Sequence, residues 1–101
     1  MIADLQTKLV VNETPVDLNE FAHQYVTSIV ICAVSLLKGG ENVKSLVFNL
    51  ENQKPKLEIN DKVIPLSPFP GDALVGTFTG MVSSLKGVNG IDKLRIEIKA
   101  K

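Results

Sequence analysis

The chain is poor in the residue types that most often carry chemistry. It contains no tryptophan and only one each of cysteine, histidine, tyrosine and arginine. A lone cysteine excludes a disulfide within the chain and any zinc site built from several cysteines. Because one histidine and scattered carboxylates have no metal-ligand spacing, we expect neither a metal nor another cofactor.

An excess of charge of either sign is also missing. Eleven Lys and Arg residues balance eleven Asp and Glu residues, so the formal net charge is zero. Proteins that bind nucleic acid or anionic membranes need concentrated positive charge, whereas the lysines of this chain are spread along the sequence. We therefore expect no nucleic-acid partner and no membrane partner.

No hydrophobic run is long enough to predict a membrane-spanning helix. The longest uncharged stretch, residues 21–37, includes His23 and several hydroxyl-bearing residues, whereas a spanning helix needs about 20 mostly apolar residues. The first residues show no charged segment followed by an apolar one, so no signal peptide is predicted. Together with an unpaired thiol, which suits a reducing compartment, these features predict a cytoplasmic protein.

What the chain does contain is enough apolar sequence for one hydrophobic core. Its 101 residues are 45% hydrophobic and 22% charged, which excludes a disordered chain. A chain of this length is expected to bury somewhat under ~70% of the surface that it exposes when unfolded. We predict a single domain over residues 1–101.

The sequence resembles itself when it is shifted by 48 residues. Residues 8–51 then align without a gap on residues 56–99, and 11 of the 44 aligned pairs are identical. Average residue usage would give roughly 3 identities by chance. The identical pairs include turn, core and helix-end positions, so two similar segments in coincidental phase explain the match less well than an internal duplication. We predict two pseudo-symmetric repeats over these ranges.

Each repeat predicts a β-hairpin, a helix and a further strand. Apolar residues alternate on both sides of turns at residues 12–15 and 60–63, which is typical of a hairpin. Asn19 and Ser67 stand at the N-cap of a helix that is expected to end at residues 38–39 and 86–87, each a lysine followed by a glycine. A last strand alternates over residues 46–50 and 94–98. The predicted fold is α+β, an internally duplicated ββαβ-ββαβ two-layer sandwich with about six mostly antiparallel strands and two helices on one face.

One face of the predicted helices differs between the two repeats. The first helix has bulky residues there, including Tyr25 and Cys32, and the second has small ones, including Gly76 and Gly80. Glycine inside a helix costs up to ~1 kcal/mol relative to alanine, so two glycines four residues apart imply a close approach. We predict that the helices lie side by side and that the bulk of the first fills the gap of the second. The alternative is that the glycine groove receives another chain.

No group of residues has the spacing of a catalytic site. His23 aligns with Gly71, so the fold does not require a histidine there, and we interpret His23 as a surface or boundary residue. Cys32 is interpreted as a small buried thiol on the helix–helix face. Residues 68–72 open the second helix irregularly, and Phe69 aligns with Phe21, which suggests packing rather than recognition.

The sequence therefore favours a small non-enzymatic interaction or structural module, a pseudo-dimer by duplication that forms a homo-oligomer or binds a protein partner. The alternative is a small-ligand binding protein with a site between the two helices or near the 68–72 loop. A large apolar patch buried between chains would favour the first hypothesis, and a cavity lined by Tyr25, Cys32, Gly76 and Gly80 the second. The tentative ligand or interface residues are Tyr25, Cys32, Gly76, Gly80, His23 and Phe69.

Overall fold

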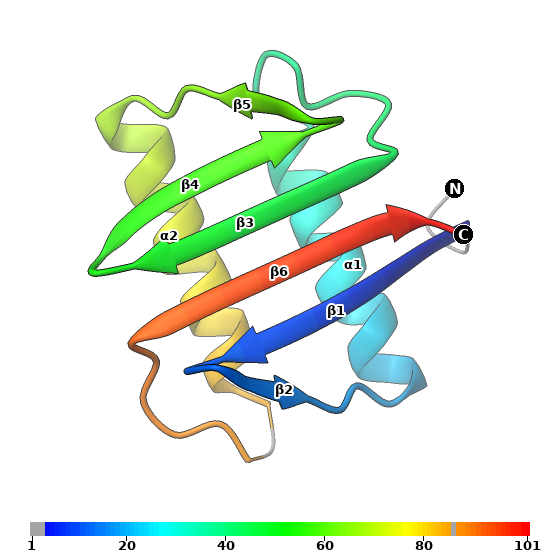
Figure 1. The fold of residues 1–101 in the computed structure, drawn as a ribbon, viewed down its shortest axis with the longest axis vertical. Coiled ribbons are helices and arrows are strands. Elements are labelled where there is room, and N and C mark those ends of the chain that lie inside the picture. The colour runs from blue at the N-terminus through cyan, green and yellow to red at the C-terminus, as the bar shows by residue number, and fades with distance from the viewer. Residues whose placement is uncertain (1–3, 86) are drawn as a thin grey trace.

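The protein is a six-stranded sheet covered on one side by two helices (Figure 1). The computed structural model describes residues 4–85 and 87–101. Over these residues the order is β1 (Leu5–Val11), β2 (Thr14–Val16), α1 (Glu20–Val34), β3 (Ser45–Glu51), β4 (Lys54–Ile59), β5 (Lys62–Ile64), α2 (Pro68–Ser83) and β6 (Lys93–Ala100). Every strand pairing is antiparallel, so the predicted α+β class with six strands is confirmed.

The strand order β2-β1-β6-β3-β4-β5 exchanges the hairpins between the two halves of the chain. The β1–β2 hairpin precedes β3 in sequence but pairs with β6, and the β4–β5 hairpin precedes β6 but pairs with β3. The central strands β3 and β6 pair with each other. In Figure 1 the hairpins form opposite edges of the sheet, and α1 and α2 run side by side in opposite directions. Neither half of the chain therefore has a continuous sheet of its own.

Three two-residue turns join the hairpin strands, and each begins with asparagine. Residues 12–13, 52–53 and 60–61 all have positive φ, between 49° and 68°. Two successive positive φ values are the mark of a type I′ turn, whose twist matches that of antiparallel strands, and asparagine tolerates this conformation better than most residues. The predicted turns are confirmed in place but are shorter than expected, because Pro15 already belongs to β2 and Val63 to β5.

The identical turn residues Asn12 and Asn60 make matching contacts. The Asn12 Oδ1 accepts hydrogen bonds from the backbone N–H groups of Asp92 and Lys93, both at 2.8 Å. The Asn60 Oδ1 accepts bonds from the N–H groups of residues 44 and 45 at 2.8 and 3.1 Å. Each asparagine therefore fastens a hairpin turn to the loop that leads into a central strand.

Both helices begin where the sequence predicts. Asn19 is the N-cap of α1, and its Oδ1 accepts a hydrogen bond from the backbone N–H of Ala22 at 2.8 Å. Ser67 holds the same position before α2 but makes no side-chain cap bond, and Pro68 follows at the first helical position, where no N–H is needed. Within the described residues neither helix has the length and hydropathy needed to cross a bilayer.

The predicted helix ends are wrong by about one turn. The helix α1 ends at Val34 and α2 at Ser83, and the predicted end at Lys86 lies outside the described residues. Serine hydroxyls compete with the helical pattern there, since Ser35 donates to the carbonyl of Cys32 at 2.6 Å and Ser83 to that of Gly80 at 2.9 Å. Backbone bonds three residues apart then replace the helical ones, and these tighter turns end each helix before its glycine.

The hydrophobic core lies between the sheet and the helices. The predicted inward positions of the two central strands are all buried: Leu46, Phe48, Leu50, Leu94, Ile96 and Ile98. Buried apolar side chains of α1 and α2 meet them, and the rings of Phe48 and Phe78 pack edge to face with centroids 4.9 Å apart. The other side of the sheet carries the alternate residues and remains open to solvent.

Candidate functional site

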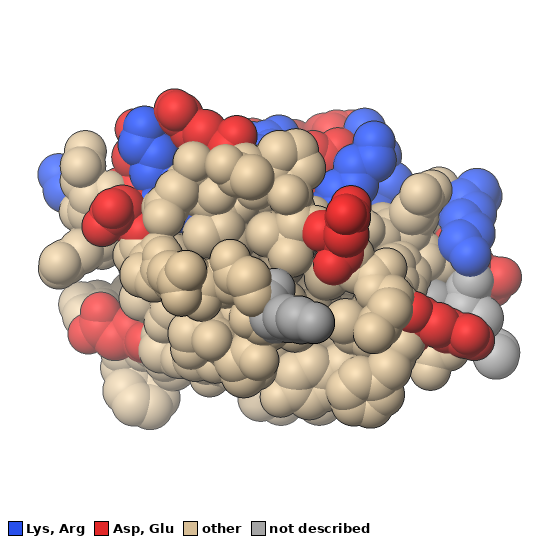
Figure 2. All heavy atoms as spheres, turned by 90° about the horizontal axis from the view of Figure 1, so that it is seen from below, with Lys and Arg blue, Asp and Glu red and all other residues tan. Residues whose placement is uncertain are grey.

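The charges of the protein are segregated between its two faces. Glu20 and Asp72 are the only acidic residues of α1 and α2, and neither helix contains Lys or Arg. Figure 2 shows blue and red spheres gathered along the upper side, where the open face of the sheet lies, and a mostly tan lower side formed by the helices. The net charge of zero therefore combines a sheet face of mixed charge with a helix layer that is almost uncharged.

Large apolar side chains project from this almost uncharged layer and from the turn that follows α1. Phe21, Leu36 and Phe69 expose 75%, 86% and 80% of their surface. The ring of Phe21 stacks on that of Tyr25 with centroids 5.8 Å apart, and Tyr25 is 37% exposed. Scattered single exposed apolar residues are common, but a group of them on one face marks an interaction surface.

The glycines of α2 are open rather than packed. A Cβ atom built at Gly76 or Gly80 would meet no atom within 4 Å. The helices do lie side by side, as predicted, but the prediction that bulky residues of α1 fill the glycine gap is wrong. Positions 76 and 80 are exposed, whereas Leu74 and Phe78 of the same helix are buried against the sheet. The contact between the two helices therefore does not involve the glycine positions.

Two further interpretations from the sequence are also corrected. Cys32 is exposed rather than buried, and Phe21 and Phe69 are not packing residues of the core. At about 100° per residue, positions 21 and 32 lie opposite the buried positions Val26 and Val30 of α1. We call the exposed set the outer helix face, and it consists of Phe21, Tyr25, Cys32, Leu36, Phe69, Gly76 and Gly80.

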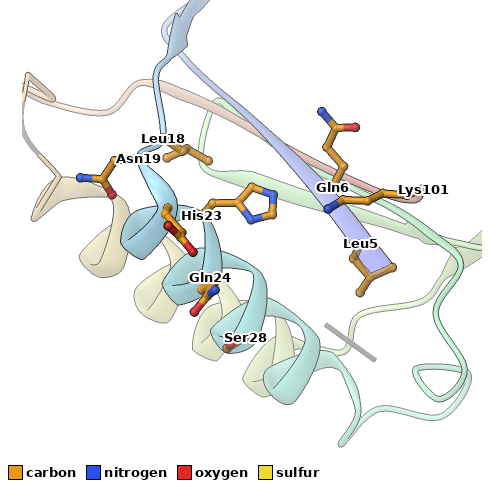
Figure 3. Close-up of a pocket in the computed structure, with 9 residues that line it drawn as sticks. Leu5, Gln6, Leu18, Asn19, His23, Gln24, Ser28 and Lys101 are labelled. Atoms are coloured by element: carbon orange, nitrogen blue, oxygen red, sulfur yellow. The ribbon is translucent and has the colours of Figure 1, made fainter. Parts of the chain in front are cut away.

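The sixth predicted residue, His23, lies elsewhere, in a hollow at one edge of the sheet (Figure 3). Strand β2 pairs only with residues 9–11 of β1, so residues 5–8 form an uncovered edge. The hollow, which we call the His23 hollow, has a volume of about 810 Å³ between this edge and the N-terminal half of α1. Its lining residues are Leu5, Gln6, Leu18, Asn19, Glu20, His23, Gln24, Ser28 and Lys101.

The imidazole of His23 closes the open edge of β1. Its Nε2 accepts a hydrogen bond from the backbone N–H of Thr7 at 3.0 Å, which places the proton of the neutral ring on Nδ1. The hydroxyls of Thr7 and Thr27 are hydrogen-bonded to each other, and that of Thr27 donates to the carbonyl of His23 at 2.6 Å. Since a hydroxyl has one proton, Thr7 is the donor to Thr27. His23 is half-buried and has a structural contact, as the boundary interpretation expects.

The opposite edge of the sheet is closed without polar groups. The same shift of 48 residues places Gly71 and Val75 at the positions of His23 and Thr27, and it places Pro55 at that of Thr7, one residue before the aligned ranges. Pro55 has no N–H that needs an acceptor. A Cβ atom built on the buried Gly71 would lie 3.7 Å from the Cγ atom of the Pro55 ring. Both edge strands therefore lack a free N–H at this point, which protects them from pairing with other chains.

Ion pairs on the open face of the sheet are exposed. Lys99 and Arg95 contact Glu97 at 3.2 and 3.4 Å, and the hydrogen bond from Lys99 is the main cause that lowers the pKa of Glu97 below its ordinary value. A hydrogen bond to Glu13 raises the pKa of Lys93. Exposed pairs of this kind contribute little to stability or binding.

Neither metal-ligand geometry nor similarity to known proteins points to an activity. Across residues 4–85 and 87–101, no cluster of His, Cys, Asp or Glu side chains is arranged to hold a metal ion. No family model, curated protein or solved structure matches the chain. The outer helix face and the His23 hollow are the two candidate sites.

Proposed function

We propose that this protein is a non-enzymatic interaction module that associates with a second copy of itself through the outer helix face. One observation carries the proposal: Phe21, Phe69 and, just after α1, Leu36 are at least three-quarters exposed. The two helices of this layer carry only one acidic residue each and no Lys or Arg. Full burial of one such side chain stabilises a complex by roughly 1.5–3 kcal/mol, and no lysine or arginine of the helices has to be desolvated.

The chemistry of this face supports a second copy as the partner. A face whose helices carry one acidic residue each meets an identical face with little like-charge repulsion, whereas a partner selected by charge would need a more highly charged surface to recognise. In a two-fold dimer each contact occurs twice, so the three exposed side chains contribute six times to one interface. Self-association therefore makes the fullest use of few apolar residues.

An internal duplication is part of the same proposal. It is supported by the sheet order, by the matching contacts of Asn12 and Asn60, and by the aligned elements of residues 8–51 and 56–99. A chain that carries two copies of one unit no longer needs identical helices. The two helices can then differ at matching outward positions, as Tyr25 and Cys32 of α1 differ from Ala73 and Gly80 of α2.

The mass in solution tests the proposed function. At low micromolar concentration, sedimentation equilibrium should give twice the 11.0 kDa of one chain. Leu36→Lys and Phe69→Lys alter exposed positions, so they should leave the fold intact but raise the dissociation constant by at least about tenfold, equivalent to about 1.4 kcal/mol.

Val63→Lys is the matched control for these variants. Val63 is a large apolar residue with 60% exposure, and it pairs across strands with Glu58 on the open face of the sheet. This variant should associate like the unmodified chain. A chain that remains monomeric at high micromolar concentration, or lysine variants that associate normally, would contradict the proposal.

Small-ligand binding is the alternative function, and the His23 hollow is the observation in its favour. The polar side chains of His23, Glu20 and Lys101 converge there with the apolar Leu5 and Leu18. A fragment screen by ¹H–¹⁵N NMR should then shift the amides of residues 5–7 and 20–24 together. The absence of shifts there, or shifts confined to the helix surface, would count against this site.

A further inference from the structure

The single histidine of the chain is bonded to the edge of the sheet through the ring nitrogen that protonation would change. We propose that His23 is an acid-sensitive latch on the uncovered edge of β1. The neutral ring occupies the edge, and protonation of the ring releases the backbone of residues 5–7. This proposal concerns the His23 hollow and does not depend on the outer helix face or on self-association.

The edge that the latch covers has backbone groups that point away from the sheet. None of the described strands pairs with residues 5–8 of β1 on the side away from β6. On the side of β6, the carbonyl of Asp4 accepts a hydrogen bond from the N–H of Lys101 at 2.8 Å. Backbone groups alternate in direction along a strand, so the N–H and C=O groups of Leu5 and Thr7 point to the uncovered edge. Such groups are the template that a further extended chain needs in order to add to a sheet.

His23 occupies the N–H of Thr7 only while its ring is neutral. The Nε2 atom accepts this hydrogen bond at 3.0 Å, so the proton of the ring is on Nδ1. A second proton can therefore bind only at Nε2, and an imidazolium has two donors and no acceptor. Because two donors would then face each other, the charged ring has to leave the N–H of Thr7.

The hollow beside the edge has room for the charged ring. Figure 3 shows the imidazole between β1 and the start of α1, facing the open space. Of the described residues that line the hollow, only Glu20 and Lys101 are charged. Glu20 lies three residues before His23 on the same helix, so its carboxylate attracts an imidazolium, whereas Lys101, which follows β6, repels it. The protonated ring is therefore expected to turn from the edge toward the start of α1.

The opposite edge of the sheet has no group of this kind that acid would change. Pro55 stands at the position of Thr7 and has no N–H, and Gly71 stands at the position of His23. The latch therefore makes only one of the two matching edges respond to acid.

Nuclear magnetic resonance of the unmodified chain tests the latch between about pH 8 and pH 5, the range in which histidine ordinarily changes charge. The ¹⁵N signals of the ring should show the Nδ1–H form at the upper end and the charged form at the lower end. Over the same range, the protection of the Thr7 amide from hydrogen exchange, corrected for the intrinsic rate at each pH, should fall roughly two- to tenfold, which matches the net contribution of one hydrogen bond. The amides of Leu9 and Leu57, which pair with β2 and β5, should keep their protection.

His23→Gln is the matched control, because the side-chain carbonyl of glutamine can take the place of Nε2 as the acceptor and does not titrate in this range. The protection of the Thr7 amide in this variant should be the same at both ends of the range. A loss as large as in the unmodified chain would assign the effect to other groups and overturn the proposal. It is also overturned if the ring of the unmodified chain stays neutral at about pH 5, or becomes charged while Thr7 keeps its protection.

Discussion

The hydrogen bond between the hydroxyls of Thr7 and Thr27 can be removed by replacing either threonine, and the two replacements should lower the free energy of unfolding by different amounts. Both residues are buried, with 6% and 0% of their surface exposed. Thr27→Val leaves the Thr7 hydroxyl with a proton and no acceptor in the core, whereas after Thr7→Val the Thr27 hydroxyl still donates to the carbonyl of His23. We expect the free energy of unfolding to fall by about 1–3 kcal/mol for Thr27→Val and by about 0.5–1.5 kcal/mol for Thr7→Val.

The double variant should recover most of this loss. Replacing both hydrogen-bonded partners by apolar groups of the same shape is nearly neutral, because no buried polar atom is then left unpaired. The other half of the chain already has this solution, with Pro55 and Val75 at the aligned positions. We expect Thr7→Val with Thr27→Val to lie within about 0.5 kcal/mol of the unmodified chain, which corresponds to a coupling energy of at least about 1 kcal/mol.

Urea unfolding followed by far-ultraviolet circular dichroism measures these differences, since the chain has no tryptophan. A Leu36→Lys background keeps self-association out of the measurement, and equal slopes with urea show that the unfolding transition is unchanged. If Thr27→Val costs no more than Thr7→Val, or if the single effects add to within about 0.3 kcal/mol, the assigned direction of the hydrogen bond is wrong.

Three other perturbations have expected outcomes. Gly40→Ala should lower the free energy of unfolding by more than about 2 kcal/mol, because its Cβ would lie 1.7 Å from the carbonyl oxygen of Val34. Gly80→Ala in the monomer should instead raise the free energy of unfolding by up to about 1 kcal/mol, and urea titration compares the two variants. Asn60→Ala should cost about 1–3 kcal/mol in the same assay, since it removes two accepted backbone bonds at a residue with positive φ, and Asn60→Asp should retain part of them. Lys99 and Arg95 lower the pKa of Glu97 from its ordinary 4.5. The ionised carboxylate therefore stabilises the fold above pH 4.5, and this stabilisation is lost as the pH falls through the lowered pKa of the folded protein. Glu97→Gln should reduce the fall in melting temperature between pH 5 and pH 3.

Local periodicity was sufficient to predict the element types because each element buries one face. The central strands alternate strictly, and every inward position from 46 to 50 and from 94 to 98 is buried. The sequence predicts the turns because asparagine tolerates positive φ. Asparagine also occurs at both of the aligned positions 12 and 60, and the two side chains make matching hydrogen bonds. Strand alternation and turn residues depend on neighbours in the chain, so they can be predicted without the tertiary structure.

The strand order and the edge contacts depend on residues distant in sequence. Nothing local indicates that β1 pairs with β6 rather than with β3, since both central strands offer equally apolar inward faces. The bond between His23 and Thr7 spans 16 residues and appears only when α1 docks beside β1. The sequence contains one indication of this contact, since Pro55, Gly71 and Val75 stand where the first half has the polar Thr7, His23 and Thr27. That difference can be interpreted only when the strands at the two edges of the sheet are known.

The outer helix face is more exposed than the sequence predicts because apolar residues occur on more than one side of each helix. In such a helix, composition does not tell which of the sides beside the sheet-facing one packs on the other helix and which faces solvent. Phe21 and Phe69 are residue types that are often buried, yet they lie on the side of each helix away from the sheet and are 75% and 80% exposed. The helix glycines were expected to have a close neighbour within the chain, and none of the described atoms provides one.

The distribution of charge distinguishes the open face of the sheet, which suits contact with water, from the helix layer, which the proposed dimer would bury. On the open face of the sheet, opposite charges lie beside each other, as in the contacts of Glu97 with Lys99 and Arg95, and water solvates what is left. The helix layer has no such compensation, since its exposed surface includes two phenylalanines and a leucine without a lysine or arginine on either helix. In the proposed dimer, covering that layer would remove this apolar surface from water.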